Sequence, residues 1–185
     1  MTTANKITLV RIALIPVFIV LLMIDSWGCQ IAAAAVFVIA SLTDMVDGHV
    51  ARKYNQITNF GKFIDPIADK LLVISGMVIL CAQGRIPGWV VVIFIAREFI
   101  ISGFRLVAAD KGKVIAAGKL GKYKTATQMA AVFLTILCLP ESGEPALGMA
   151  GVWLSNIFLY ASLVLAIWSC VVYVRDNRSV LDEEK

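Results

Sequence analysis

Four aspartates lie within a short part of the chain that is otherwise mostly apolar: Asp44, Asp47, Asp65 and Asp69. The first two are three residues apart, and the last two are four residues apart. In a helix, either spacing places both carboxylates on one face. Ionisable groups inside a membrane protein are costly and are functional by default, so this cluster is the first candidate for a site.

Four carboxylates at close range repel one another, and two divalent cations would neutralise them. Ligand sets made only of oxygen favour hard ions, so we expect Mg²⁺ or Mn²⁺ rather than Zn²⁺. Carboxylates shared by two metals are typical of sites that clamp the oxygens of a phosphate undergoing displacement. The alternative is a set of unrelated interfacial charges that pair with nearby basic residues, namely Arg52, Lys53, Lys62 and Lys70.

Small residues stand beside the carboxylates at Gly48, Ala51 and Gly61. They either allow helices to approach closely or leave room for a ligand next to the metals. Arg52 either anchors its helix at the interface or pairs with a phosphate or an aspartate. The only histidine, His49, excludes a histidine-rich metal site. The cysteines lie far apart and are expected to be small buried hydrophobes: Cys29, Cys81, Cys138 and Cys170.

The elements that must position these groups are membrane helices. Of the 185 residues, 59% are hydrophobic and 16% are charged, and the mean hydropathy is +0.84. A soluble domain is usually about 45–50% apolar. Six segments approach the roughly 20 residues that a transmembrane helix needs: Ile7–Ile24, Ile31–Val50, Ile64–Ala82, Trp89–Ala109, Tyr123–Leu139 and Val152–Val174. The sequence therefore predicts an all-α fold: one domain over residues 1–175, an integral membrane bundle of six transmembrane helices, and a charged tail at 176–185.

The positive charges predict the orientation of this bundle. If both termini are cytoplasmic, fifteen of the seventeen Lys and Arg residues lie on the inner side, as the positive-inside rule requires. Arg97 lies within a predicted helix, where we expect it to pair with a neighbouring carboxylate, and Arg85 lies in an outer loop. Because Arg11 interrupts the first apolar stretch, we expect that the N-terminus is not a cleaved signal peptide. We expect a bacterial cytoplasmic membrane, with the site facing the cytoplasm.

Polar groups gather in the inner halves of the second to fifth helices, whereas the outer halves are expected to be clean hydrocarbon. This pattern predicts a polar cavity open to the inner side. Arg105 shares a helix face with Glu98 and Ser102, and the next helix begins with a basic group: Lys119, Lys122, Lys124 and Thr125. Free N–H groups at that helix start would favour an anion. The alternative for the lysines is attraction to anionic lipid, which we prefer for Lys111 and Lys113.

The pattern Asp44-x-x-Asp47-Gly48-x-x-Ala51-Arg52, then eight residues, then Gly61-x-x-x-Asp65-x-x-x-Asp69, resembles the signature of the CDP-alcohol phosphotransferase family. The resemblance implies six membrane helices, cytoplasmic termini and a homodimer. It implies that an acceptor hydroxyl attacks the β-phosphorus of a CDP-linked lipid and that CMP leaves. The four aspartates would hold two divalent metals, and Asp69 would be the general base. Cytidine diphosphate would be framed by Gly48, Ala51, Arg52 and Gly61.

Three looser segments, "NKITLVRIALIP", "REFIISGFR" and "GKYKTATQM", resemble the phosphatidylglycerolphosphate synthase branch of that family. The resemblance implies that CDP-diacylglycerol reacts with sn-glycerol 3-phosphate. An acceptor that carries its own phosphate would explain the additional cations around the cavity. In the first segment, Asn5, Thr8 and Arg11 either contact the nucleotide or anchor the helix at the interface.

Three other readings remain open. The same chemistry could use serine, inositol phosphate or phosphatidylglycerol as the acceptor, although serine would not need the additional cations. A divalent-cation transporter would use the aspartates as an ion path, but the outer halves of the helices offer no matching polar groups. A catalytically silent lipid-binding scaffold would not need the complete carboxylate set. No feature indicates nucleic-acid binding.

Overall fold

The computed structural model describes residues 3–53, 59–111, 118–138 and 148–178. Within the helices it leaves out the side chains of residues 3–7, 44–53, 59–63, 65–66, 69 and 119. The described chain forms six helices and contains no strand: α1 (Thr3–Met23), α2 (Trp27–Lys53), α3 (Asn59–Ala82), α4 (Gly88–Asp110), α5 (Lys119–Cys138) and α6 (Gly148–Asp176). The all-α prediction is confirmed, and each of the six predicted segments coincides with a helix.

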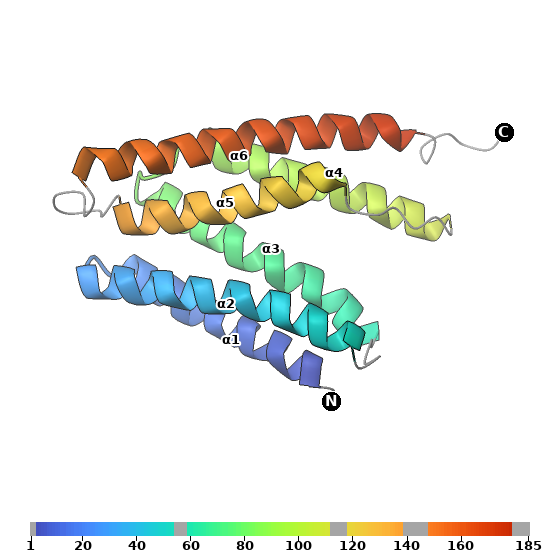
Figure 1. Cartoon of the computed structure of the whole chain (residues 1–185), viewed down its shortest axis with the longest axis horizontal. Coiled ribbons are helices and arrows are strands. Elements are labelled where there is room, and N and C mark those ends of the chain that lie inside the picture. The colour runs from blue at the N-terminus through green and yellow to red at the C-terminus, as the bar shows by residue number, and fades with distance from the viewer. Residues whose placement is uncertain (1–2, 54–58, 112–117, 139–147, 179–185) are drawn as a thin grey trace.

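The helices form an elongated bundle and alternate in direction along its long axis (Figure 1). α1 packs against α2 and α3, and α6 packs against α4 and α5. α3 lies between these two groups and contacts α4 and α5 as well. The start of α1 and the end of α6 lie at the same end of the bundle, together with the end of α2 and the start of α3 (Figure 1). An even number of alternating helices therefore brings both terminal helices to the end that carries the aspartate-bearing segments.

At the opposite end, α3 and α4 are joined by a tight turn. The N–H of Gly84 bonds to the carbonyl of Cys81 at 2.9 Å, and the N–H of Arg85 bonds to the carbonyl of Leu80 at 2.9 Å. This pair of bonds is a Schellman cap, in which the residue after the C-cap, here Gly84, adopts the left-handed conformation. Gly84 has φ 73°, which a residue without a Cβ tolerates. Pro87 then precedes the first residue of α4.

A core of buried side chains from all six helices holds the bundle together. At its centre the rings of Phe18 and Phe37 lie 5.6 Å apart, and Phe18 is fully buried. Gly76 faces this ring so closely that a Cβ there would lie 3.1 Å from Phe18 Cζ. The cysteines are free. Cys138 is buried, as predicted, whereas Cys29, Cys81 and Cys170 are half-buried.

α6 packs on its neighbours through small side chains. Its buried face includes Gly151, Ser155, Ser162, Ala166 and Ser169. The three serine hydroxyls each donate to a carbonyl of their own helix three residues earlier, at 2.7–3.1 Å. Small residues let helices approach closely, and these internal hydrogen bonds satisfy the hydroxyls without water.

A cluster of polar side chains, the polar knot, lies where α1, α2 and α3 meet at the end of the bundle opposite the aspartate segments. Gln83 Nε2 donates to the carbonyl of Leu22 at 2.8 Å, and Gln30 Nε2 donates to the carbonyl of Ile24 at 3.3 Å. Arg85 Nη1 donates to Gln30 Oε1 at 3.0 Å. All three polar side chains lie just outside the predicted apolar segments Ile31–Val50 and Ile64–Ala82. Their position has a physical reason: α1 leaves its last carbonyls without partners in the helix, and the two glutamine side chains satisfy them.

One described helix, α6, is both long and apolar enough to cross a membrane by length and composition, with a mean hydropathy of 2.3 in its most apolar window. Shorter apolar helical stretches occur at Thr8–Met23, Trp27–Thr43 and Lys70–Ala82. α4 has a comparable length, but Arg97, Glu98 and Arg105 interrupt it. Two of these residues, Arg97 and Glu98, lie where the candidate site is found.

Candidate functional site

A small cavity opens between α3, α4 and α5. Its lining consists of Lys70, Val73, Ile74, Glu98, Lys124, Thr125 and Gln128. Val73 follows Asp69 by four residues, which is about one helical turn. The α3 segment that carries Asp65 and Asp69 therefore continues directly from the cavity wall.

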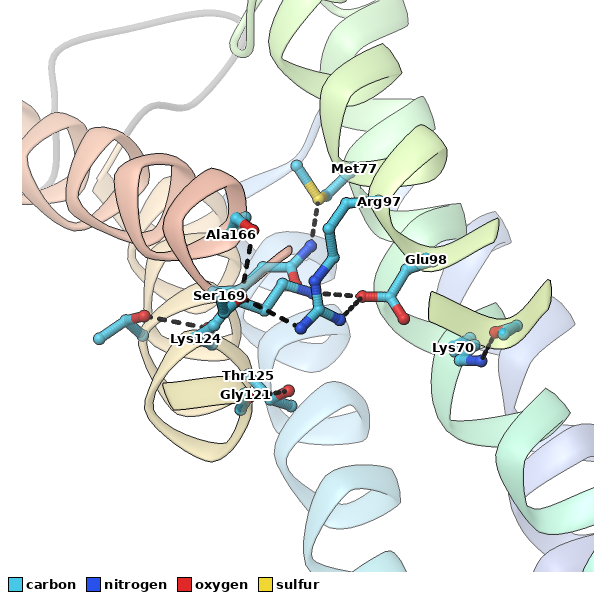
Figure 2. A network of polar contacts seen from close by, with 12 residues as sticks. Lys70, Met77, Arg97, Glu98, Gly121, Lys124, Thr125, Ala166 and Ser169 are labelled. Atoms are coloured by element: carbon cyan, nitrogen blue, oxygen red, sulfur yellow. Dashed lines mark hydrogen bonds and ion pairs between the residues drawn. The ribbon is translucent and has the colours of Figure 1, made fainter. Parts of the chain in front are cut away.

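Glu98 is the charged centre of this wall. Its Oε1 accepts a hydrogen bond from Arg97 Nη1 at 3.0 Å, and it also forms an ion pair with the ammonium of Lys124. The three side chains are 15%, 11% and 2% exposed, respectively. Figure 2 shows the guanidinium and the carboxylate turned toward each other. The expectation that Arg97 pairs with a neighbouring carboxylate is confirmed.

The other side of the Arg97 guanidinium reaches α6. Arg97 Nη2 donates to Ser169 Oγ at 3.2 Å, and Ser169 Oγ donates to the carbonyl of Ala166 at 3.1 Å. A Cβ on Gly121 would lie 3.6 Å from the same Nη2. A continuous polar chain therefore links α6, α4 and α5 through Ser169, Arg97, Glu98 and Lys124 (Figure 2).

Three further contacts complete the wall. Lys70 Nζ donates to Ser102 Oγ, so Glu98 and Ser102, four residues apart on α4, each hold a lysine from another helix. Gln128 is buried and its Nε2 lies 3.0 Å from Met77 Sδ. Thr125 Oγ1 donates to the carbonyl of Gly121 at 3.1 Å.

The predicted acceptor-binding residues are placed differently from one another. Lys124 and Thr125 line the cavity, and the Lys124 ammonium lies 5.5 Å from the centre of the Phe94 ring. Arg105 and Lys122 are exposed. Lys119 begins α5, but its side chain is outside the described part of the chain.

Of the predicted nucleotide-binding residues in α1, Thr8 and Arg11 are both buried. Arg11 Nε donates to the carbonyl of Ala40 at 3.1 Å and lies 3.5 Å from Thr43 Oγ1. Thr43 directly precedes Asp44, so Arg11 fixes α1 against the turn of α2 where the aspartate segment begins. Asn5 lies in α1, with its side chain outside the described residues.

The four aspartates lie in the helices that the sequence predicts for them. Asp44 and Asp47 are in α2, Asp65 and Asp69 are in α3, and these two helices are in contact. Their side chains, and those of Ala51 and Arg52, lie outside the described part, as do the surroundings of Gly48 and Gly61. Among the residues whose side chains are described, no group of three or more His, Cys, Asp and Glu could hold a metal. The donor chemistry of the four carboxylates fits two hard cations.

Sequence reasoning assigned no site role to several residues that the structure brings to the cavity. The sequence predicts Lys70 only as a partner for the aspartates and predicts no role for Gln128. Ser169 has no predicted role, although Ser155, Ser162 and Ser169 recur every seven residues in an apolar segment. That spacing, which keeps residues near one helix face, was the available signal.

Comparisons with known proteins show which family the chain resembles. Residues 1–168 match the model of the CDP-alcohol phosphatidyltransferase family. The chain is 48% identical over 145 residues to the CDP-diacylglycerol–glycerol-3-phosphate 3-phosphatidyltransferase of Bacillus subtilis (strain 168), covering 72% of this chain and 75% of the relative. It is 39% identical over 163 residues to the protein of the same name from Rickettsia typhi, covering 88% and 89% of the two chains. It is also 35% identical over 191 residues to a cardiolipin synthase (CMP-forming) of Oryza sativa subsp. japonica, covering 95% of this chain and 57% of the relative.

Proposed function

The chain belongs to the CDP-alcohol phosphatidyltransferase family, and on that premise we propose that it transfers the phosphatidyl group of CDP-diacylglycerol to sn-glycerol 3-phosphate. The products are phosphatidylglycerol phosphate and CMP. The observation that supports this acceptor best is the cationic wall of half-buried Lys70 and buried Lys124, which continues along α3 from the aspartate segment. Relatives that carry the name of this activity support the same choice.

The chemical step is an in-line displacement at phosphorus. The acceptor hydroxyl oxygen forms a bond to the β-phosphorus, the bond from that phosphorus to the bridging oxygen breaks, and CMP takes the electron pair. Asp69 accepts the proton of the hydroxyl. Asp44, Asp47, Asp65 and Asp69 would hold two Mg²⁺ or Mn²⁺ ions, which supply neutralising charge at the diphosphate. Positioning and charge neutralisation provide most of the catalysis in phosphoryl transfer.

The nucleotide site is proposed to lie along the inner parts of α1, α2 and α3. Its residues are Asn5, Thr8, Arg11, Gly48, Ala51, Arg52 and Gly61. The buried contact of Arg11 with the Ala40 carbonyl supports this placement, because it ties α1 to the turn of α2 just before Asp44. Small residues at three of these positions would leave space for the diphosphate beside the carboxylates.

The phosphate of the acceptor is proposed to enter the cavity between α3, α4 and α5. Lys124 and Thr125 lie in its wall, and Arg105, Lys119 and Lys122 would attract the anion from the inner side. An ammonium in a partly dehydrated site interacts with phosphate more strongly than it does in bulk water. The cavity thus separates the acceptor phosphate from the carboxylates by about one turn of α3.

The six helices are proposed to span a bacterial cytoplasmic membrane with both termini in the cytoplasm. By its length and composition α6 could cross a membrane. Large apolar side chains such as Trp153, Val164 and Trp168 are exposed on it. Contiguous exposed apolar surface of this kind is typical of contact with lipid or with another protein. We expect the enzyme to be a homodimer.

The experiment is an assay of CMP release by detergent-purified protein with CDP-diacylglycerol and Mg²⁺. Parallel reactions contain sn-glycerol 3-phosphate, serine, inositol phosphate or phosphatidylglycerol. Release only with glycerol 3-phosphate, lost in Asp69→Asn, supports the proposal. Release only with phosphatidylglycerol would instead favour the activity named for the rice relative. If no acceptor yields CMP while a known enzyme works in the same buffer, the enzymatic proposal fails.

A further inference from the structure

The proposed reaction gives no role to Glu98, although this carboxylate lies in the wall of the acceptor cavity. Its side chain is only 15% exposed, and it interrupts an otherwise apolar stretch of α4. A carboxylate at this position would repel an incoming phosphate. Because a buried charge is costly unless it is paired, its presence beside an anion site requires a specific reason.

The contacts of Glu98 supply that reason. Lys124 has a long and flexible side chain, which can direct its ammonium to many positions. In the structure the ammonium is held by Glu98 Oε1 and lies over the Phe94 ring. The same oxygen is held from its other side by Arg97 Nη1 at 3.0 Å, and Arg97 is tied to Ser169 on α6. The position of the Lys124 ammonium is thus fixed through three helices.

The net charge of this wall supports the same conclusion. Three cations, Lys70, Arg97 and Lys124, gather near the single carboxylate of Glu98 among the described residues. Together they leave a surplus of two positive charges. A phosphate monoester carries a charge of about −1.5 to −2 at pH 7, so the wall can neutralise one such group.

We infer that Glu98 is a positioning residue for the acceptor: it holds the Lys124 ammonium at the cavity wall, in the place where the ammonium meets the acceptor phosphate. This inference rests on the proposed function, since it requires an acceptor that carries a phosphate. Without the carboxylate, repulsion between the Arg97 guanidinium and the Lys124 ammonium drives the lysine away from that place. Glu98 acts through Lys124 and does not touch the reacting atoms.

The test measures KM for sn-glycerol 3-phosphate, KM for CDP-diacylglycerol and kcat in the full-length protein in detergent. Glu98→Gln keeps the shape and removes the charge. It should raise the KM for glycerol 3-phosphate about tenfold or more, as expected when a charge-assisted contact is lost. The KM for CDP-diacylglycerol should stay within about twofold of the wild-type value, because the contacts that bind this substrate are unchanged. Glu98→Asp, which keeps the charge, should give an intermediate KM.

A double-variant cycle separates positioning from a purely structural effect. Lys124→Met alone should raise the same KM, and adding Glu98→Gln to it should change that KM little further, because coupled residues are not additive. Ser75→Ala is the matched control, since among the described residues this hydroxyl bonds only to carbonyls of its own helix, at 2.6 and 3.1 Å. It should leave all three kinetic constants unchanged.

The outcomes are distinguishable. If the wild type releases CMP with glycerol 3-phosphate but Glu98→Gln leaves its KM unchanged, only the inference is overturned. Additive effects of the two substitutions, or equal rises in both KM values with a lower Tm, would also overturn it. If Glu98→Gln does not give folded protein, the same KM values are measured for Glu98→Asp, alone and combined with Lys124→Met. The same criteria then apply to these variants. If the wild type uses only acceptors without a phosphate, the proposed function fails and the inference fails with it.

Discussion

The ring of Phe18 on α1 occupies the space that a side chain on Gly76 of α3 would need. A Cβ at Gly76 would lie 3.1 Å from Phe18 Cζ and 3.5 Å from Val132 Cγ1. Phe18 cannot move aside easily, because it is fully buried and packs against Phe37. The absence of a side chain at one position therefore sets how closely α1 and α3 approach.

Gly76→Val should consequently destabilise the bundle by about 1–3 kcal/mol, the usual effect of overpacking a core. Thermal unfolding in detergent measures the change. Gly103→Val is the matched control, because this glycine is also within a helix and a Cβ there would meet nothing within 4 Å. Equal losses of stability in the two variants would contradict the packing argument.

Asp69→Asn should reduce kcat by at least about a hundredfold, since a positioned general base contributes about 10²–10⁴-fold. The CMP-release assay measures this loss at saturating concentrations of both substrates. Asp176→Asn serves as the control, because Asp176 is exposed and pairs only with exposed Arg175 in the described structure. Activity of the Asp69 variant close to that of the control would rule out Asp69 as the base.

Mg²⁺ should stabilise the wild-type protein against heat even in the absence of substrates. A ligand that binds only the folded state at about 100 times its Kd adds about 2.7 kcal/mol. Tm measured with Mg²⁺ and with a chelator gives the difference. The double variant Asp44→Asn with Asp65→Asn should lose this difference; if it keeps the full Mg²⁺-dependent shift, the metal is bound elsewhere.

Arg11→Lys should raise the KM for CDP-diacylglycerol about tenfold while leaving the KM for the acceptor nearly unchanged. A lysine has no donor at the position of Nε, which contacts the Ala40 carbonyl at 3.1 Å, and it cannot reproduce the planar fork of arginine. Arg175→Lys, at an exposed position, is the control. A rise in the acceptor KM instead would place Arg11 in the acceptor site.

Gln30→Leu should lower stability by about 1–3 kcal/mol, the cost of leaving buried polar groups without a partner. Gln30 is buried and contacts both the Ile24 carbonyl and the Arg85 guanidinium. Chemical or thermal unfolding measures the loss. Both KM values should stay unchanged, since the polar knot lies far along the bundle from the cavity.

The positions of the helices could be predicted because their apolar runs are long and separated by polar or glycine-containing segments. The ends were less predictable. The segment predicted as Ile31–Val50 is helical from Trp27 to Lys53, because aromatic and basic residues continue a helix after the apolar run has ended. Hydropathy marks the part of a helix in contact with hydrocarbon, whereas backbone hydrogen bonding determines where the helix stops.

The candidate site was predicted less completely than the fold. The helical spacing of Glu98 and Ser102 correctly placed both on one face of α4. Their partners, Lys124 and Lys70, lie 26 and 32 residues away, and the sequence does not specify which face of one helix meets another. Such pairs depend on helix rotation and packing, which small residues such as Gly76 determine only in three dimensions.

The turn at Gly84 has a consequence for the site at a distance. Five residues, 83–87, connect α3 to α4. The left-handed Gly84 and the ring of Pro87 restrict the backbone conformations of this connection. Successive residues of a helix are rotated by about 100° about its axis. The length of the connection therefore determines how α4 is rotated relative to α3. This rotation places Ser102 against Lys70 and Glu98 against Lys124. A turn about 20 Å along α3 from Lys70 thus determines which side chains of α4 face the acceptor cavity.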